Sequence, residues 1–159
     1  MSFEIRLDPH LDDPRLARFL GEHLADMRRV SPPESVHALD LQALRQPGIS
    51  FWSAWQGEQL VGSVALKRLD AGHAELKSMR CDAQLRGRGL GRALLLHALE
   101  QARAMGFQRL SLETGPQPFF EPARKLYQRH GFQACGPFAD YGPDPYSCFM
   151  SLSLSAPGP

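Results

Sequence analysis

The sequence has no marked excess of either charge and no long apolar run. Its 18 basic and 17 acidic residues leave a formal net charge of +1. A chain so close to neutral has no overall field to attract nucleic acid or an anionic membrane, so we expect neither as a partner and expect any anion site to be local. No stretch approaches the roughly 18 apolar residues that are typical of a membrane-spanning helix.

Cysteine is scarce, with three residues, Cys81, Cys135 and Cys148, that cannot all pair within one chain. The sequence also has no CxxC and no HxxxH spacing, so we predict free thiols and no metal site. The first residues carry charges and lack the apolar core of a secretory signal. Together these absences predict a cytoplasmic protein in a reducing compartment.

The length of 159 residues fits one domain. Hydrophobic residues make up 43% of the chain and charged residues 22%, which is typical of a folded protein and argues against wholesale disorder. We predict that residues 1–154 form a single domain. Residues 155–159, with the sequence Ser-Ala-Pro-Gly-Pro, are expected to be a flexible tail.

The spacing of apolar residues predicts strands and helices in mixed order. The strongest helical pattern lies between Leu90 and Met105, with Gly106 as its expected stop. Because strands dominate the middle of the chain, the predicted fold class is α+β, or mixed α/β. Strands are predicted at 3–7, 49–55, 59–69, 74–81, 109–114, 133–137 and 147–154, and helices at 12–29, 34–44, 90–105 and 123–130.

A glycine-rich turn joins the strand at 74–81 to the helix at 90–105. Alternate glycines permit positive φ angles and a close approach of the backbone to a ligand. The start of the helix offers unpaired N–H groups to an anion, and three arginines add local positive charge. The turn matches neither a Walker loop, which needs Gly-Lys-Ser/Thr, nor the GxGxxG dinucleotide fingerprint, whose last position is here Arg92. We therefore predict a pyrophosphate site.

Two motifs resemble those of a known family. Gln84-x-x-Gly87-x-Gly89 resembles the Q/R-x-x-G-x-G/A signature of the GNAT superfamily of N-acetyltransferases. Leu126-Tyr127-x-x-x-Gly131-Phe132 is similar to the end of the fourth helix of that family. The segment Leu112-Glu113-Thr114-Gly115, followed by Pro137-Phe138-Ala-Asp-Tyr141, resembles a bacterial subgroup with LETG on the fifth strand.

The resemblance implies a GNAT fold, in which a single twisted, mostly antiparallel sheet splays after its fourth strand and is flanked by about four helices. It implies acetyl-CoA as the cosubstrate and no metal. By position, the backbone of Met79 and Cys81 is expected to pair with the pantetheine arm. The residues expected to hold the pyrophosphate are Arg86, Gly87, Arg88, Gly89, Leu90, Gly91 and Arg92.

Acyl transfer to an amine needs a neutral amine and a protonated leaving group. Tyr127 stands where the family usually carries its general acid, although its spacing also suits a core tyrosine. Glu75 and Glu113 are the candidate bases, and each also fits the simpler role of a carboxylate paired with Lys77 or Arg80.

The acceptor is expected to lie among the two glutamates, Thr114 and Tyr141. Strand alternation places Glu75 on the same face as Cys81, six residues later, and points Glu75 and Glu113 into one polar pocket. A Pro-rich polar loop at 137–147, which contains Tyr141, either closes over the acceptor or is an ordinary surface loop.

The predicted function is acetyl-CoA-dependent N-acetylation of a primary amine of a small molecule, by direct attack. Two alternatives stay open, namely acetylation of a protein on lysine or its N-terminus, and a non-catalytic CoA-binding module. The loop at 137–147 favours a lidded pocket for a small molecule, and Tyr127 with the two glutamates argues against a mere binder. The sequence leaves a homodimer open.

Overall fold

The computed structural model describes residues 3–36, 40–85 and 87–154. The predicted tail at 155–159 and one residue of the predicted pyrophosphate site, Arg86, lie outside the described residues.

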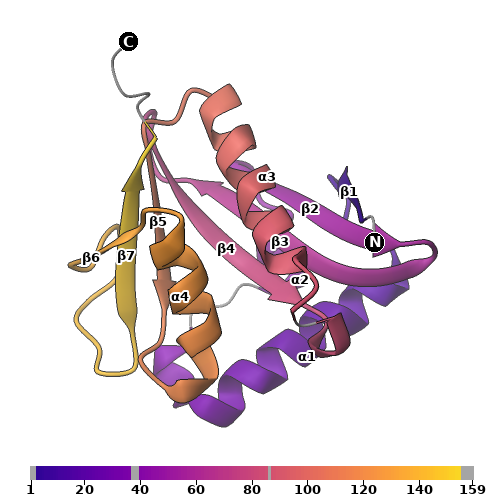
Figure 1. The fold of residues 1–159 in the computed structure, drawn as a ribbon, viewed down its shortest axis with the longest axis horizontal. Coiled ribbons are helices and arrows are strands. Elements are labelled where there is room, and N and C mark those ends of the chain that lie inside the picture. Colours follow the sequence, from indigo (N-terminus) through magenta and orange to yellow (C-terminus); the bar gives the residue numbers. More distant parts are fainter. Residues whose placement is uncertain (1–2, 37–39, 86, 155–159) are drawn as a thin grey trace.

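The described strands form one sheet in the order β1-β2-β3-β4-β5-β7-β6. Neighbouring strands are antiparallel except for β4 and β5, which are parallel. Figure 1 shows the sheet twisting from β1 at one edge to β6 at the other. The strands are β1 (Glu4–Leu7), β2 (Ile49–Gln56), β3 (Gln59–Arg68), β4 (His73–Cys81), β5 (Arg109–Thr114), β6 (Gln133–Cys135) and β7 (Cys148–Ser153).

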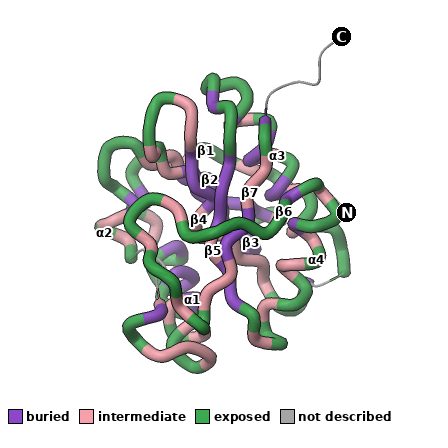
Figure 2. Tube along the Cα trace, turned by 90° about the vertical axis from the view of Figure 1, so that its left-hand side faces the viewer, coloured by how far each residue is buried: buried purple, intermediate pink, exposed green. Residues whose placement is uncertain are grey.

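Helices cover both faces of the sheet (Figure 1). The apolar sides of α3 and α4 pack on one face, and those of α1 and α2 pack on the other. Buried segments accordingly follow the central strands, with exposed segments in the surrounding loops (Figure 2). The helices are α1 (Pro14–Val30), α2 (Leu41–Leu44), α3 (Leu90–Ala104) and α4 (Glu121–Arg129), and three short 3₁₀ turns lie at Pro33–Ser35, Ala83–Leu85 and Pro118–Phe120.

Local sequence signals explain where the two long helices begin and end. The Asp13 side chain accepts a hydrogen bond from the backbone N–H of Arg15 at 2.9 Å and caps α1 at Pro14, which occupies the first turn. Gly89 precedes α3 with φ +84°, and Gly106 follows it with φ +87°. Only glycine adopts such angles readily, so both ends of α3 follow directly from the sequence.

The prediction of one helix at 34–44 is wrong. Val36 and Asp40 both have extended backbone, so the helical pattern is divided into the 3₁₀ turn at Pro33–Ser35 and the four-residue α2. Asp40 interrupts the pattern because it acts as a cap, accepting a hydrogen bond from the backbone N–H of Ala43 at 2.8 Å.

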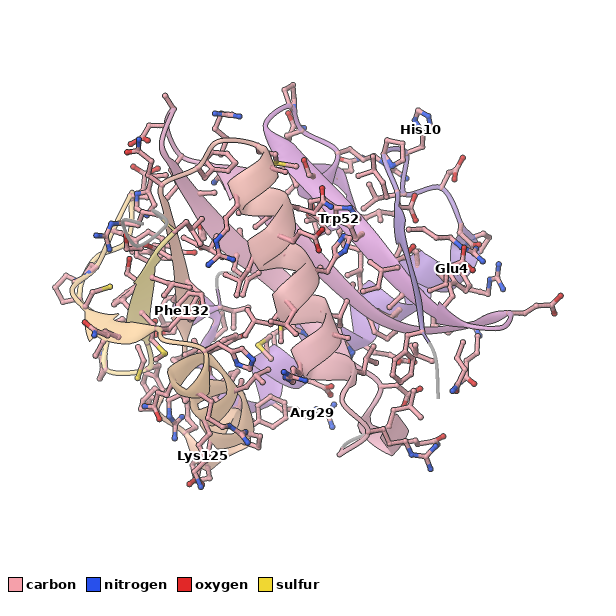
Figure 3. All side chains as sticks on the ribbon, turned by 45° about the horizontal axis from the view of Figure 1, so that its top comes forward. Glu4, His10, Arg29, Trp52, Lys125 and Phe132 are labelled. Atoms are coloured by element: carbon pink, nitrogen blue, oxygen red, sulfur yellow. The ribbon has the colours of Figure 1, made fainter. Side chains whose placement is uncertain are left out.

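Both tryptophans lie in the core. Trp52 is 3% exposed and Trp55 5% exposed. Trp52 lies beneath α3 (Figure 3), where its ring meets the edge of the His97 ring with the centroids 5.3 Å apart. Trp55 faces the other side of the sheet and packs with the residues of α1.

The parallel strands β4 and β5 separate midway. Their pairing runs from His73 opposite Arg109 to Leu76 opposite Leu112. Beyond this point β4 continues along β3 as far as Cys81, while β5 continues along β7. The predicted splay after the fourth strand is thus confirmed, and it opens the sheet next to the start of α3.

A bulge in β4 changes which side chains share a face. Lys77 stands opposite Ala65 of β3, and Arg80 stands opposite Ser63, so β4 contains one residue more than β3 between these pairs. Ser78 lies in the bulge with φ +53°, and its carbonyl accepts a hydrogen bond from the Ser63 hydroxyl at 2.7 Å. Because residues paired across a sheet point the same way, Lys77 and Arg80 share one face although they are three positions apart.

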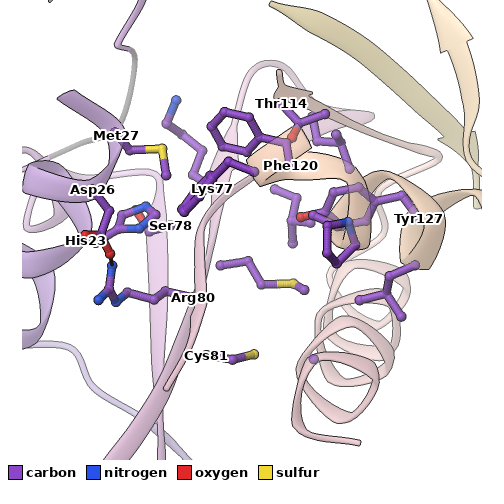
Figure 4. A pocket seen from close by; sticks show the side chains of 18 of the residues that line it. His23, Asp26, Met27, Lys77, Ser78, Arg80, Cys81, Thr114, Phe120 and Tyr127 are labelled. Atoms are coloured by element: carbon purple, nitrogen blue, oxygen red, sulfur yellow. Dashed lines mark hydrogen bonds and ion pairs between the residues drawn. The ribbon is translucent and has the colours of Figure 1, made fainter. Parts of the chain in front are cut away.

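The prediction that Glu75 and Cys81 share a face is therefore wrong. Glu75 lies on the face of Lys77 and Arg80, which α1 covers, whereas Cys81 lies on the opposite face. Figure 4 shows the Arg80 side chain directed toward α1 and the Cys81 side chain directed toward α3. The simple alternation of side chains between the two faces of β4 fails here, because the extra residue in the bulge reverses the face of every later residue.

Leu94 provides a test of the packing between α3 and the sheet. It is fully buried, and its side chain approaches Gly62 of β3 so closely that an added Cβ would lie 3.0 Å from it. Leu94→Ala is expected to lower the free energy of unfolding by about 2–5 kcal/mol, measured by urea denaturation. Leu96 lies on the same helix but is 41% exposed, so Leu96→Ala should change the free energy of unfolding by less than about 0.5 kcal/mol. Equal effects of the two changes would contradict this packing.

Candidate functional site

A cavity of about 1110 Å³ lies where β4 and β5 separate. In Figure 4 its walls are α1, with His23 and Met27, on one side and α4, with Tyr127, on the other. The cavity brings together most of the residues that the sequence singled out, from segments far apart in the chain. They are Glu75, Met79, Cys81, Gly87, Gly89, Leu90, Gly91, Arg92, Glu113, Thr114 and Tyr127.

Two of the predicted residues that the structure describes do not line this cavity. Arg88 lies beside it, in the exposed turn before α3. Tyr141 is connected to the cavity indirectly, because it forms hydrogen bonds with Lys77 and Glu75 of β4, which do line it.

The glycine turn forms the end of the cavity at the start of α3. Gly87 and Gly89 have φ angles of +77° and +84°, and a Cβ at either would meet no atom within 4 Å. These glycines are therefore required by backbone conformation rather than by crowding. The first intrahelical hydrogen bond joins the Ala93 N–H to the Gly89 carbonyl, so the N–H groups of the first helical turn are left for another acceptor.

These features fit the phosphate groups of acetyl-CoA. A positively polarised helix start beside a turn with open space is a common anion site, and Arg92 adds a cation to the lining. The separated strands expose the edge of β4 at Met79 and Cys81 to the same cavity, which suits an extended ligand arm running along the strand.

Gly89→Asp tests this anion site. Aspartate tolerates a positive φ better than most residues, but its carboxylate would compete for the N–H groups at the start of α3 and repel phosphate. We expect the Kd for acetyl-CoA to rise on the order of 100-fold or more, measured by calorimetry. Gly106→Asp is the matched control, because Gly106 has φ +87° and open space at the other end of α3. Equal affinity of the two variants would place the phosphate groups elsewhere.

Tyr127 is buried between α4 and the sheet. Its side chain is 7% exposed and packs against Phe132, with the ring centroids 5.7 Å apart. Burial holds the pKa of Tyr127 well above its ordinary value, and the neighbouring Cys81 acts in the same direction. The phenol therefore keeps its proton throughout the neutral range. Tyr127 is at once a core residue, as its spacing suggested, and a residue of the cavity lining, and its role as the general acid stays a prediction.

At the other end of the cavity, Glu75 lies in a buried cluster of hydrogen bonds. The Lys77 ammonium donates to Glu75 Oε2 at 3.1 Å and to the Tyr141 hydroxyl at 2.9 Å. Tyr141 in turn donates to the same carboxylate oxygen at 2.5 Å. The Glu75 and Lys77 side chains are 3% and 8% exposed. Burial and the Glu75 carboxylate hold the pKa of Tyr141 far above its ordinary value.

Glu113 is the second carboxyl of this end, and its surroundings differ. Burial raises the pKa of Glu113 to about 7, and the nearby carboxylates of Glu75 and Asp144 act in the same direction. The Ser147 hydroxyl and the Lys77 ammonium oppose this rise. A pKa in this range is what a general base at neutral pH requires.

The loop before β7 borders this end of the cavity, where Tyr146 is part of the lining. Asp144 accepts a hydrogen bond from the Ser35 hydroxyl at 2.6 Å, which joins the loop to the 3₁₀ turn after α1. Tyr141 holds the same loop to β4. The loop at 137–147 is thus anchored beside the cavity, and its role as a cover over an acceptor stays a prediction.

Polar residues of α1 and the end of β4 complete the lining. Arg80 donates to Asp26 at 2.8 Å, and both residues line the cavity. Burial lowers the pKa of His23 to about 4, with a further contribution from the Arg80 charge, so its ring is neutral at pH 7. Sequence reasoning missed His23, Asp26 and Ser35 because only the packing of α1 against β4 brings them to the site. The sequence analysis considered Lys77 as an ion-pair partner of Glu75 but did not predict that it lines the cavity.

Comparisons with known proteins agree with this architecture. The model of the acetyltransferase (GNAT) family matches residues 16–132. The chain is 51% identical over 150 residues to the uncharacterized N-acetyltransferase YsnE of Bacillus subtilis, covering 94% of this chain and 99% of that protein. It is 49% identical over 152 residues to the uncharacterized N-acetyltransferase YedL of Escherichia coli, covering 96% and 95%.

A solved structure shows the same fold. A crystal structure from Klebsiella pneumoniae, named as an acyl-CoA N-acyltransferase, superposes with a TM-score of 0.76 at 28% identity, covering 96% of this chain and 98% of that one. The chain therefore belongs to the GNAT family of acetyltransferases. It is an acyltransferase, and its general chemistry is acetyl transfer. Among the described residues, no helix has the length and apolar character to cross a membrane.

Proposed function

We propose that this enzyme transfers the acetyl group of acetyl-CoA to a primary amine of a small molecule, by direct attack of the amine. The observation that carries the proposal is the composition of one cavity. It has an anion-binding turn at one end and, at the other, a partly buried carboxyl, Glu113, that titrates near neutral pH.

Acetyl-CoA, when bound, supplies an acetyl thioester. The residues of the turn and the start of α3 bind its phosphate groups. Arg86 is included in this set on the basis of the sequence prediction alone. The exposed edge of β4 at Met79 and Cys81 orients the arm of the cosubstrate. Tyr127 holds a proton at its phenol oxygen for the leaving group, which its raised pKa keeps in place at neutral pH.

At the acceptor end we assign the general base to Glu113. Glu75 already binds the Lys77 ammonium and the Tyr141 hydroxyl, so its carboxylate is less available than that of Glu113 to take a proton from the acceptor amine. Thr114 lines the cavity beside Glu113 and is assigned to acceptor binding. Because Glu75 is paired with Lys77 and Asp26 with Arg80, the ionised form of Glu113 is the uncompensated charge among these lining residues, and it favours a cationic amine.

The preference for a small molecule rests on the loop before β7. The Asp144–Ser35 and Tyr141–Glu75 hydrogen bonds hold this loop at two points beside the acceptor end, where Tyr146 lines the cavity. A long peptide needs an open trough, whereas a small amine fits a covered pocket. A cytoplasmic location stays a prediction of the sequence.

An acceptor panel tests the proposal. Thiol release from acetyl-CoA would be measured with small primary amines, lysine-containing peptides and peptides with free N-termini. We expect the highest kcat/KM for a small amine, above the background without acceptor. Turnover confined to the peptides would support a protein acetyltransferase. Tight binding of acetyl-CoA without turnover of any acceptor would support a binding module.

A further inference from the structure

Lys77 and Glu113 occupy neighbouring positions on the two strands that separate at the acceptor end. Glu75 of β4 pairs with Ser111 of β5 in the parallel register, so Lys77 and Glu113 each follow two residues further along on the same face. The pairing ends one step before them. The Lys77 ammonium thus lies near enough to Glu113 to oppose the rise in its pKa.

The hydrogen bonds of Lys77 nevertheless go elsewhere. Its Nζ donates to Glu75 at 3.1 Å and to Tyr141 at 2.9 Å, and Tyr141 closes the triangle by donating to Glu75 at 2.5 Å. An ammonium has three donors, so this triangle uses two of them. The side chain of Lys77 is only 8% exposed, so water gives it few other partners.

The phenol of Tyr141 is held in place by contacts that do not involve Lys77. Its ring packs edge-on against Phe138, with the centroids 5.1 Å apart, and against Phe149 at 5.5 Å. The hydrogen bond of Asp144 to Ser35 fixes the same loop three residues further on. The position of the phenol oxygen is therefore set by the loop and its aromatic contacts.

We propose that Tyr141 is a positioning residue that, together with Glu75, keeps the Lys77 ammonium from forming an ion pair with Glu113. The inference rests on the proposed function, in which Glu113 takes the proton of the acceptor amine. An ion pair stabilises the charged form of a carboxyl and makes it a weaker base. Without the phenol oxygen, Lys77 loses one acceptor, and Glu113 is the neighbouring carboxyl across the separated strands.

The comparison of wild type with Tyr141→Phe isolates the phenol, because the ring keeps its packing and the other charged groups around Glu113 are unchanged. The charges that act on Glu113 are those of Glu75 and Lys77 from β4 and Asp144 from the loop, while Arg80, Asp26 and the neutral His23 line the same cavity.

The experiment is a carbon-13 NMR titration of the Glu113 carboxyl in the enzyme without substrates. In Tyr141→Phe we expect the pKa of Glu113 to fall by about 1–3 pH units, the usual effect of an opposite charge at close range. Adding Lys77→Met to Tyr141→Phe should abolish this fall, because the phenol acts through the ammonium. An unchanged Glu113 titration in Tyr141→Phe, or the same fall without Lys77, would overturn the inference.

Kinetics separate this inference from the proposed function. If Glu113→Gln leaves kcat/KM and its pH dependence unchanged, Glu113 is not the base and the proposed function fails, whatever the titration shows. If Glu113→Gln abolishes the dependence on a group near pH 7 but Tyr141→Phe leaves that group in place, the base assignment stands and the positioning role of Tyr141 fails.

Discussion

Glu113→Gln is expected to lower kcat/KM for a lysine-like amine about 10²–10⁴-fold at pH 7, the usual contribution of a general base. Such an amine, with a pKa of about 10.4, holds its proton by roughly 4.6 kcal/mol at pH 7. An α-amine, with a pKa of about 7.7–8.0, costs only about 1 kcal/mol to deprotonate at pH 7. Glu113→Gln should therefore lower kcat/KM less for an α-amine than for a lysine-like amine.

The pH dependence gives the sign of this effect. The pKa of Glu113 is raised to about 7, so its basic form grows as the pH rises through that value, and kcat/KM of the wild type should rise and then level off. In Glu113→Gln only amine that is already neutral reacts, so kcat/KM should keep rising toward the pKa of the amine. The defect should therefore shrink at high pH.

A surface glutamate serves as the control for Glu113. Glu100→Gln, on the exposed side of α3, removes the same charge away from the cavity and should leave the profile unchanged. The base assignment would be abandoned if both variants gave the wild-type profile when assayed with the best acceptor of the panel.

Tyr127→Phe is expected to reduce kcat about 10²–10⁴-fold while leaving the affinity for acetyl-CoA nearly level. The substitution keeps the aromatic packing of Tyr127 on Phe132 but removes the phenolic proton. Single-turnover kinetics would show whether the loss lies in the chemical step, and calorimetry would give the affinity.

Two readouts show whether Tyr127 has only a structural role. Loss of the hydroxyl from a packed ring should leave the melting temperature close to that of the wild type, so a large fall in stability would point to misfolding rather than lost chemistry. A change in kcat of less than about threefold, or roughly 0.65 kcal/mol, would show that the phenol is only a core residue.

Local signals in the sequence predicted most of the fold. The glycines that flank α3 and the apolar spacing within it located that helix because a positive φ and a helical period are properties of a few adjacent residues. The helix predicted at 34–44 failed because the capping role of Asp40 competes with its place in a helical pattern. That competition is decided by a single hydrogen bond, which spacing alone does not reveal.

The acceptor end of the site shows where sequence reasoning stops. Alternation correctly placed Glu75 and Glu113 on one face, since each strand is regular up to that point. It failed beyond Ser78, because one extra residue in the bulge reverses the face of Cys81. Nothing near Lys77 in the sequence indicates that Tyr141, from a distant loop, receives its hydrogen bond.

The sequence by itself determined the family, the order of most elements and the glycine turn before α3, because these depend on backbone conformations set by neighbouring residues. Only the tertiary structure decided that the two candidate carboxyls have different surroundings. Glu75 and Glu113 are the same residue type on adjacent strands, yet one is engaged by Lys77 and Tyr141 and the other is left with a pKa of about 7. Burial and charged neighbours create that difference, and they arise only when distant segments pack together.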